Sequence, residues 1–265
     1  MGMTTGSKPV FLDRGRGQAL VLVHAFPLDG RLWQGQIDEL SAVARVLVPD
    51  LRGFGRSSEL PAPVTLDEHA DDIAALLDDL GVERATVLGM SMGGYIAFAF
   101  ARRHRSRLAG LVLANTRATA DDEQGKRGRN AKIAQVERDG VAPVVDEIAA
   151  SLLSPSAPVA VVERVRQIIG SQTPGGFRAA HMALRDRVDS TPLLPHLDVP
   201  TLVIASERDI VTPVAGIQAM ANAIPGAELT VLADAGHLSN LEDPRGFTAS
   251  VRGFLEKLPT RSAGV

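Results

Sequence analysis

The sequence predicts an α/β protein: a mostly parallel sheet with helices on both of its faces. Short Val/Leu-rich runs at about 19–23, 45–48, 85–88, 109–113, 201–205 and 228–232 have the apolar character of buried parallel strands. Stretches with helical character separate them, and such alternation favours a sheet covered on both faces. Residues 116–197 interrupt the alternation. We therefore expect a core built from 1–115 and 198–265, with 116–197 inserted as a helical cap.

The first clearly marked helix follows the strands at 19–23 and 45–48. Thr65 is a good capping residue, and Asp67 and Glu68 place negative charge in the first helical turn. The helix is expected to run to about Leu80, with Gly81 closing it.

The strand at 85–88 leads into the most informative stretch, Gly89-Met90-Ser91-Met92-Gly93, which has the pattern G-x-S-x-G. An apolar segment suited to a buried helix follows, so Ser91 is expected at a strand-to-helix turn. That context is typical of a nucleophile elbow, which exposes a reactive serine hydroxyl. We interpret Ser91 as a nucleophile and the Met92 N–H as an oxyanion donor. The alternative is a Gly/Ser turn without chemistry.

The insertion 116–197 looks helical throughout. Apolar-periodic stretches occur near 143–153 and 159–169, and prolines and a Gly-Gly pair punctuate it. We expect its apolar residues mainly to pack the cap onto the core. Four of them are candidates for an apolar pocket roof: Leu152, Leu153, Phe177 and Met182. The alternating charges at 121–129 are expected on a solvated helix face.

A serine nucleophile needs a base, and the base needs an orienting acid. His237 follows the strand at 228–232 in a loop of small residues and is the expected base. His104 is better suited to a helix C-terminus, and His181 and His196 are expected at the surface.

Asp209 is the expected acid because it follows the strand at 201–205, and the chain order Ser, Asp, His fits a triad of this kind. Glu207 is a nearby alternative. Asp234 is a rival, but it shares a short loop with His237 and is badly placed to hold the far ring nitrogen.

The second oxyanion donor is expected in the loop after the strand at 19–23. Phe26 is the candidate, because Pro27 has no N–H. His24 is interpreted as a structural group that shapes this loop. By their places next to the triad, Phe26, Met92 and Leu238 are expected to form an apolar pocket floor.

Taken together, these motifs resemble the α/β-hydrolase superfamily, in its group of small carboxylesterases, lactonases and cofactor-free haloperoxidase-like enzymes. The matching stretches span nearly the whole chain: 24–27, 49–57, 89–94, 206–213 and 235–244. The resemblance implies triad roles for Ser91, Asp209 and His237 and oxyanion-hole roles for Phe26 and Met92. Ala25 departs from the glycine usual in the family.

The function expected from these residues is hydrolysis of a small carboxylic ester or lactone through an acyl-enzyme, without cofactor or metal. A lactonase similar to 3-oxoadipate enol-lactonases is the nearest rival. An anionic lactone would need a cation at the pocket, for which the candidates are Arg117, Arg178, Arg185 and Arg187. Peroxide replacing water, as in perhydrolases, and a ligand-binding regulator on the same fold remain alternatives.

Composition sets wider bounds. With 45% hydrophobic residues and a net charge of −3, the 265-residue chain can bury a core and offers no electrostatic reason to expect nucleic acid or membrane partners. It has no cysteine, which excludes disulfides. Residues 1–9 are small and polar, without the apolar core of a signal peptide, so a cytoplasmic location is expected. Nothing in the sequence indicates an oligomeric state.

Overall fold

The computed structural model describes residues 9–59 and 63–259; most of the stretch 1–9 thus lies outside the described residues. Seven strands form one sheet in the order β1-β3-β2-β4-β5-β6-β7, and only the β1–β3 pair is antiparallel. The strands are β1 Phe11–Arg14, β2 Ala19–Val23, β3 Arg45–Pro49, β4 Ala85–Met90, β5 Leu108–Ala114, β6 Thr201–Ser206 and β7 Glu228–Leu232.

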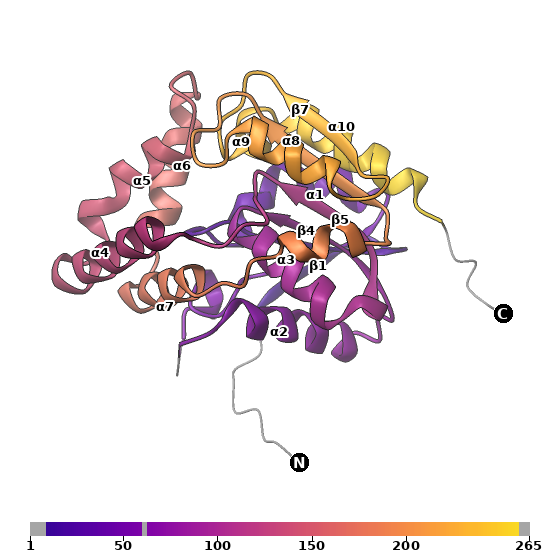
Figure 1. Ribbon diagram of the computed structural model, residues 1–265, viewed down its shortest axis with the longest axis horizontal. Helices are drawn as coiled ribbons and strands as arrows, with labels where there is room; N and C mark the ends of the chain where they lie inside the picture. Colours follow the sequence, from indigo (N-terminus) through magenta and orange to yellow (C-terminus); the bar gives the residue numbers. More distant parts are fainter. Residues whose placement is uncertain (1–8, 60–62, 260–265) are drawn as a thin grey trace, which may run out of the picture.

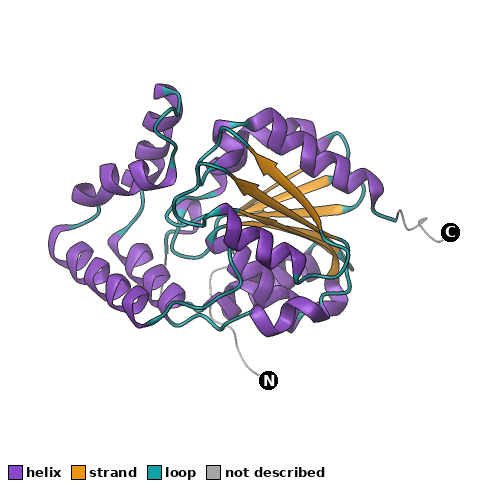
Figure 2. Cartoon of the chain, turned by 45° about the horizontal axis from the view of Figure 1, so that its top comes forward, coloured by secondary structure: helices purple, strands orange, loops and turns teal. Residues whose placement is uncertain are grey.

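Side-chain alternation along the strands divides the interior into two apolar layers, one on each face of the sheet. Val21 and Val23 of β2 pack with α2 (Leu66–Asp79), α3 (Met92–Arg103) and α8 (Val214–Asn222), whereas Leu20 and Leu22 pack with α1 (Gln34–Ser41) and α10 (Pro244–Lys257). Successive strand residues point to opposite faces, so the continuous apolar run of β2 can fill both layers. Figure 2 shows the sheet between its two helical layers.

The helices of residues 116–197 lie at one end of the molecule (Figure 1), and the segment returns to the sheet layers through Leu194 and Leu197. These helices are α4 (Glu123–Asp139), α5 (Val145–Leu152), α6 (Val159–Gly170) and α7 (Pro174–Arg185), joined to β6 through a 3-10 helix, η5 (Thr191–His196). The remaining short elements are η1 Gly30–Trp33, η2 Gly55–Ser57, η3 Arg105–Arg107, η4 Ala142–Val144 and α9 Ser239–Glu242.

The expected fold class is confirmed, and six strands and the helix after Thr65 lie where the sequence predicts them. Thr65 and Glu68 form a reciprocal capping box, in which each side chain accepts from the other's backbone N–H. The sequence reading missed β1. That strand has four residues, none of them fully buried, at the antiparallel edge of the sheet, so it lacks the apolar signal of the interior strands.

Candidate active site

Ser91 lies where β4 ends and α3 begins, at the carboxyl edge of the sheet. Its backbone has φ 53° and ψ −113°, a strained conformation for a residue with a side chain. The neighbouring glycines make this turn possible by close approach. A Cβ on Gly89 would lie 2.1 Å from the Gly93 carbonyl oxygen, and a Cβ on Gly93 would lie 2.2 Å from that of Val23. The turn therefore presents Ser91 above the sheet, as the G-x-S-x-G pattern predicts.

Phe26 and Met92, whose N–H groups are the expected oxyanion donors, line the same cavity as Ser91. Met92 is the first residue of α3, so its N–H has no acceptor within the helix. Phe26 sits inside the turn after β2 that is closed by the bond from Leu28 N–H to the Ala25 carbonyl. His24 braces this loop: its Nε2 accepts from Leu51 N–H, and its Nδ1 therefore carries the proton donated to the Ala25 carbonyl. Burial lowers the pKa of His24, which keeps the ring neutral and structural.

Asp209 is held in a dense set of hydrogen bonds beyond the end of β6. Its carboxylate accepts from the backbone N–H groups of Val211 and Thr212 at 2.8 and 2.9 Å, and from the Asn115 amide at 2.9 Å. Burial alone would raise the pKa of Asp209, but hydrogen bonds from His237 and Thr212 and the His237 charge lower it to about 2. The carboxylate is therefore a fixed negative charge.

His237 is buried with its Nδ1 2.8 Å from Asp209 Oδ2. Its other nitrogen, Nε2, is buried without a hydrogen-bond partner among the described residues, and the ring lines the same cavity as Ser91. The rival acid Asp234 lies instead at the surface, paired with Arg208. Asp209 thus orients His237 from a different loop, which is the arrangement expected from the sequence.

Asn115 was missed by sequence reasoning. Its amide donates to Asp209 and to Ser206, and its side-chain oxygen accepts from Ser239. It directly follows β5, between the strands that carry Ser91 and Asp209, and strand-end position is the signal that could have found it.

The serine and histidine share a cavity of about 250 Å³ between the sheet edge and the helices of 116–197. Its lining mixes apolar and charged side chains. From the core it takes Phe26, Ser91, Met92, Tyr95, Val211 and His237, and from 116–197 it takes Arg117, Arg129, Lys132, Glu147, Ile148, Ser151, Leu152, His181 and Leu184.

Of the four expected roof residues, the structure places only Leu152 in this wall. Its neighbour Leu153 packs in the apolar layer that also holds residues of α10, because α5 ends at Leu152 and Leu153 has an extended backbone (φ −119°, ψ 152°). Phe177 is fully buried and does not line the cavity. Its ring packs edge-to-face against the ring of Phe26, with 5.1 Å between the two centroids.

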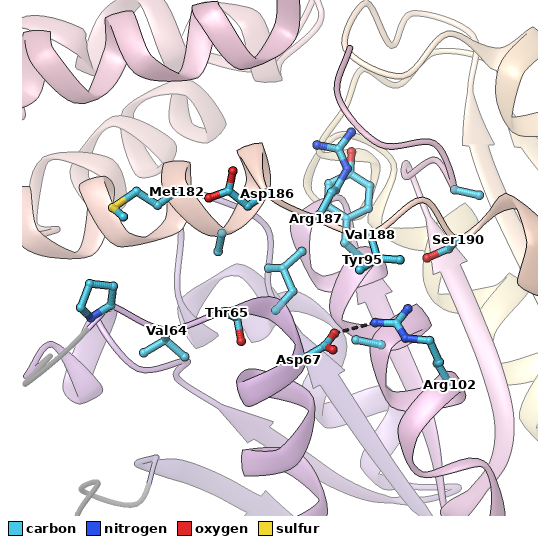
Figure 3. A pocket seen from close by; sticks show the side chains of 15 residues that line it. Val64, Thr65, Asp67, Tyr95, Arg102, Met182, Asp186, Arg187, Val188 and Ser190 are labelled. Carbon is cyan, nitrogen blue, oxygen red and sulfur yellow. Dashed lines mark hydrogen bonds and ion pairs between the residues drawn. The ribbon is translucent and has the colours of Figure 1, made fainter. Parts of the chain in front are cut away.

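Met182 points into a separate cleft with Tyr95, Asp186 and Arg187 (Figure 3). Leu238, expected in the floor, is fully buried in the core and donates its N–H to the Leu152 carbonyl. The expectation of an apolar roof over an apolar floor is corrected accordingly.

Two further expectations on charged and polar groups are corrected. His181, expected at the surface, is 5% exposed and lines the cavity. Asp121, expected on a solvated helix face, is buried and pairs with three guanidinium groups, those of Arg117 (2.8 Å), Arg129 (3.0 Å) and Arg187 (2.8 Å). Tertiary packing brings these arginines from three places in the chain to one carboxylate.

Of the four arginines considered as anion partners, only Arg117 lines the cavity. Arg178 pairs with Glu137, and Arg185 with Asp186, both away from the cavity. Arg187 is buried on Asp121 and lies over the Tyr95 ring. The other cavity cations, Arg129 and Lys132, come from α4 and were not anticipated.

Within 9–59 and 63–259, no group of three or more His, Cys, Asp or Glu side chains is placed to hold a metal ion. No helix in the same ranges is both long and apolar enough to span a bilayer.

Comparisons with known proteins agree with this geometry. A family model described as the alpha/beta hydrolase fold matches residues 18–244. The chain is 31% identical to 3-oxoadipate enol-lactonase 2 of Acinetobacter baylyi, over 90% of this chain and 89% of that protein.

Solved structures are similar too. One is a thermophilic esterase from Thermogutta terrifontis with malate bound (42% identity, TM-score 0.91, 94% of this chain and 93% of that one). Another is the enol-lactonase from Burkholderia xenovorans (28% identity, TM-score 0.87, 94% and 96%). The chain belongs to the α/β-hydrolase family, and its activity is that of a hydrolase.

Proposed function

We propose that this protein is a serine hydrolase that cleaves a small carboxylic ester or lactone through an acyl-enzyme. One observation carries the proposal: His237 is bound through Nδ1 to the buried Asp209 carboxylate, while its free Nε2 and Ser91 line one cavity. This is the relation among nucleophile, base and acid that acyl transfer requires.

In the proposed reaction, the Ser91 oxygen attacks the substrate carbonyl and His237 Nε2 takes the serine proton. Asp209 keeps the His237 proton on Nδ1 and stabilises the imidazolium that forms. The Phe26 and Met92 N–H groups would stabilise the oxyanion. His237 then protonates the departing alkoxide, and a water activated by His237 releases the acid. The Ser91 hydroxyl makes no hydrogen bond to His237 in the described structure, and such bonds commonly tighten only with substrate bound.

The segment 116–197 is proposed to act as a cap that sets specificity, because it supplies most of the cavity wall facing Ser91. Pockets of this kind combine apolar surface with a few polar anchors.

A second candidate, hydrolysis of an anionic lactone or ester, is favoured by the three cations of the wall: Arg117, Arg129 and Lys132. Glu147 pairs with Lys132, and Asp121 is shared by three arginines, so the cluster keeps excess positive charge. The enol-lactonases among the similar proteins are consistent with a cyclic ester as substrate.

The test combines covalent labelling with a substrate panel. A fluorophosphonate should add once to the wild-type protein, as measured by intact mass, and should not add to Ser91→Ala. p-Nitrophenyl esters of increasing chain length and a set of neutral and carboxylated lactones should then separate esterase from lactonase activity. Slow single-turnover hydrolysis with a stable product complex would instead support a ligand-binding regulator. Labelling of the Ser91→Ala variant would refute the assignment of the nucleophile.

A further inference from the structure

His181 lines the cavity but has no role in the proposed Ser91–His237–Asp209 mechanism. It lies on α7, one helical turn after Phe177, and its ring meets the Phe26 ring at 4.7 Å between centroids. The side chain is 5% exposed, and neither ring nitrogen has a hydrogen-bond partner among the described residues.

Buried polar atoms are almost always hydrogen-bonded, so two unpaired nitrogens on one ring require an explanation. His24, which is also buried, uses both of its ring nitrogens to brace the loop after β2. His237 uses Nδ1 for Asp209 and leaves Nε2 for chemistry at Ser91. The ring nitrogens of His181 therefore resemble His237 Nε2, which is also buried and free to bind a substrate atom, and differ from the hydrogen-bonded nitrogens of His24.

The surroundings of His181 define what it can bind. Burial lowers the pKa of His181 to about 3, and the positive charges of Arg129 and Lys132 act in the same direction, against the opposing charge of Asp121. The ring is therefore neutral and offers one N–H donor and one acceptor nitrogen. Because Arg129 and Lys132 line the same cavity, a group bearing an oxygen acceptor is favoured there over a second donor.

We propose that His181 is a specificity-determining residue that donates a hydrogen bond to an oxygen function, such as an oxo group, on the acyl part of the substrate. This inference rests on the proposed function. The acyl part is the natural partner because it stays attached to Ser91 in the cavity through both half-reactions, and His181 lies against Phe26, the proposed oxyanion loop.

The experiment compares two esters of equal chain length, p-nitrophenyl pentanoate and p-nitrophenyl 4-oxopentanoate, which differ in one CH₂ replaced by C=O. The readout is the ratio of their kcat/KM values, corrected by their rates of uncatalysed alkaline hydrolysis. We expect the wild type to favour the oxo ester by about fivefold, the usual value of one hydrogen bond. His181→Phe should bring the ratio close to one, and His181→Gln, which keeps a donor, should restore part of it.

Met182→Leu is the matched control, because Met182 is adjacent on α7 but faces the separate cleft in Figure 3, and it should keep the wild-type ratio. Thermal unfolding of each variant tests a purely structural role. A ratio that is the same in the wild type and His181→Phe, with a lowered Tm in the variant, would mean that the ring only supports the fold and would overturn the inference. If the wild type hydrolyses neither ester nor any lactone, the proposed function fails, and the inference fails with it.

Discussion

The sheet edge and the segment 116–197 form opposite sides of one cavity, but they hold their polar groups differently. At the sheet edge, Asp209 accepts from two backbone N–H groups and three side chains, and Asn115 ties it to Ser206 and Ser239. In 116–197, the cavity carries ion-paired cations on one helix, and on another it carries His181, whose ring nitrogens have no hydrogen-bond partner within 9–59 and 63–259.

The difference follows from how each side is built. The polar groups of the sheet edge come from short loops after adjacent parallel strands, whose positions are set by backbone hydrogen bonds. Most of the polar groups on the other side come from helices, which contact the core largely through side chains. The first arrangement suits chemistry that needs fixed geometry, and the second suits a wall that can differ between relatives with different substrates.

The largest effect is expected from a substitution at the sheet edge. Ser91→Ala should lower kcat/KM for a p-nitrophenyl ester by roughly 10⁴-fold or more, because the proposed acyl-enzyme cannot form. The free energy of unfolding should stay close to that of the wild type, since only a hydroxyl is lost. Steady-state kinetics and urea unfolding measure the two quantities. Retention of most activity would contradict the triad.

Asp209→Asn should lower kcat by roughly 10²–10⁴-fold, because an amide in that place no longer stabilises the His237 imidazolium and favours the wrong tautomer. The matched control is Asp234→Asn, whose carboxylate is 83% exposed and pairs with Arg208 at the surface. It should change kcat by less than about twofold, because this carboxylate has no hydrogen bond or ion pair with His237 among the described residues. The opposite ranking of the two variants would make Asp234 the acid.

The low pKa of Asp209 also predicts how acid acts on stability. With a folded-state pKa of about 2 and an ordinary value of 3.8, this carboxylate contributes about 2 kcal/mol to the free energy of unfolding above pH 5. That contribution is present above the unfolded-state pKa and is lost as the pH falls through the folded-state pKa.

Urea unfolding of the wild type and Asp209→Asn between pH 7 and pH 2.5 measures this contribution. The stability difference between the two proteins should shrink as the pH falls below about 5. A difference that stays constant over this range would show that the Asp209 charge does not contribute to stability.

The charged wall of the cavity can be tested with Arg129→Gln. If Arg129 attracts an anionic substrate, the variant should lose about tenfold in kcat/KM for a carboxylated ester or lactone relative to its neutral counterpart, as expected for a partly screened charge interaction. Asp121 would keep Arg117 and Arg187 as partners, so the fold should be retained. Arg178→Gln is the control, because Arg178 pairs with Glu137 outside the cavity. An equal effect of both substitutions would exclude a local anion site.

The smallest effect is expected from a comparison of two neighbouring leucines of the segment 116–197. Leu152 lines the cavity, whereas Leu153 packs only in the core, and both are buried. Both Leu→Ala variants should lose stability, by about 2–5 kcal/mol for a fully packed site. Only Leu152→Ala should shift the relative kcat/KM across ester chain lengths, by several-fold for each methylene. A shift of equal size in both variants would mean that the substitutions change specificity by destabilising residues 116–197 as a whole, not by changing the cavity wall.

The sequence alone was enough to predict the α/β class, six strands, the elbow at Ser91 and the pairing of Asp209 with His237. Each of these depends on local patterns: apolar runs, glycines required at a tight turn, and polar residues directly after strands. The order of these residues along the chain then predicts that they lie close together, because parallel strands bring their carboxyl ends to one edge of the sheet.

Only the tertiary structure decided which residues of 116–197 face Ser91. His181 and Met182 are neighbours on α7, and a rotation of about 100° between successive helical residues separates the cavity wall from the outer cleft. Leu152 ends α5 and Leu153 follows it in extended backbone, so these two neighbours also face different surroundings. Tertiary packing likewise decides that Asp121 is buried among Arg117, Arg129 and Arg187. It also decides that the ring nitrogens of His181 have no hydrogen-bond partner in the described part of the chain. Helical periodicity shows that a face is apolar but not which neighbour covers it, so the cavity wall from 116–197 could not be predicted from the sequence as the arrangement at the sheet edge could.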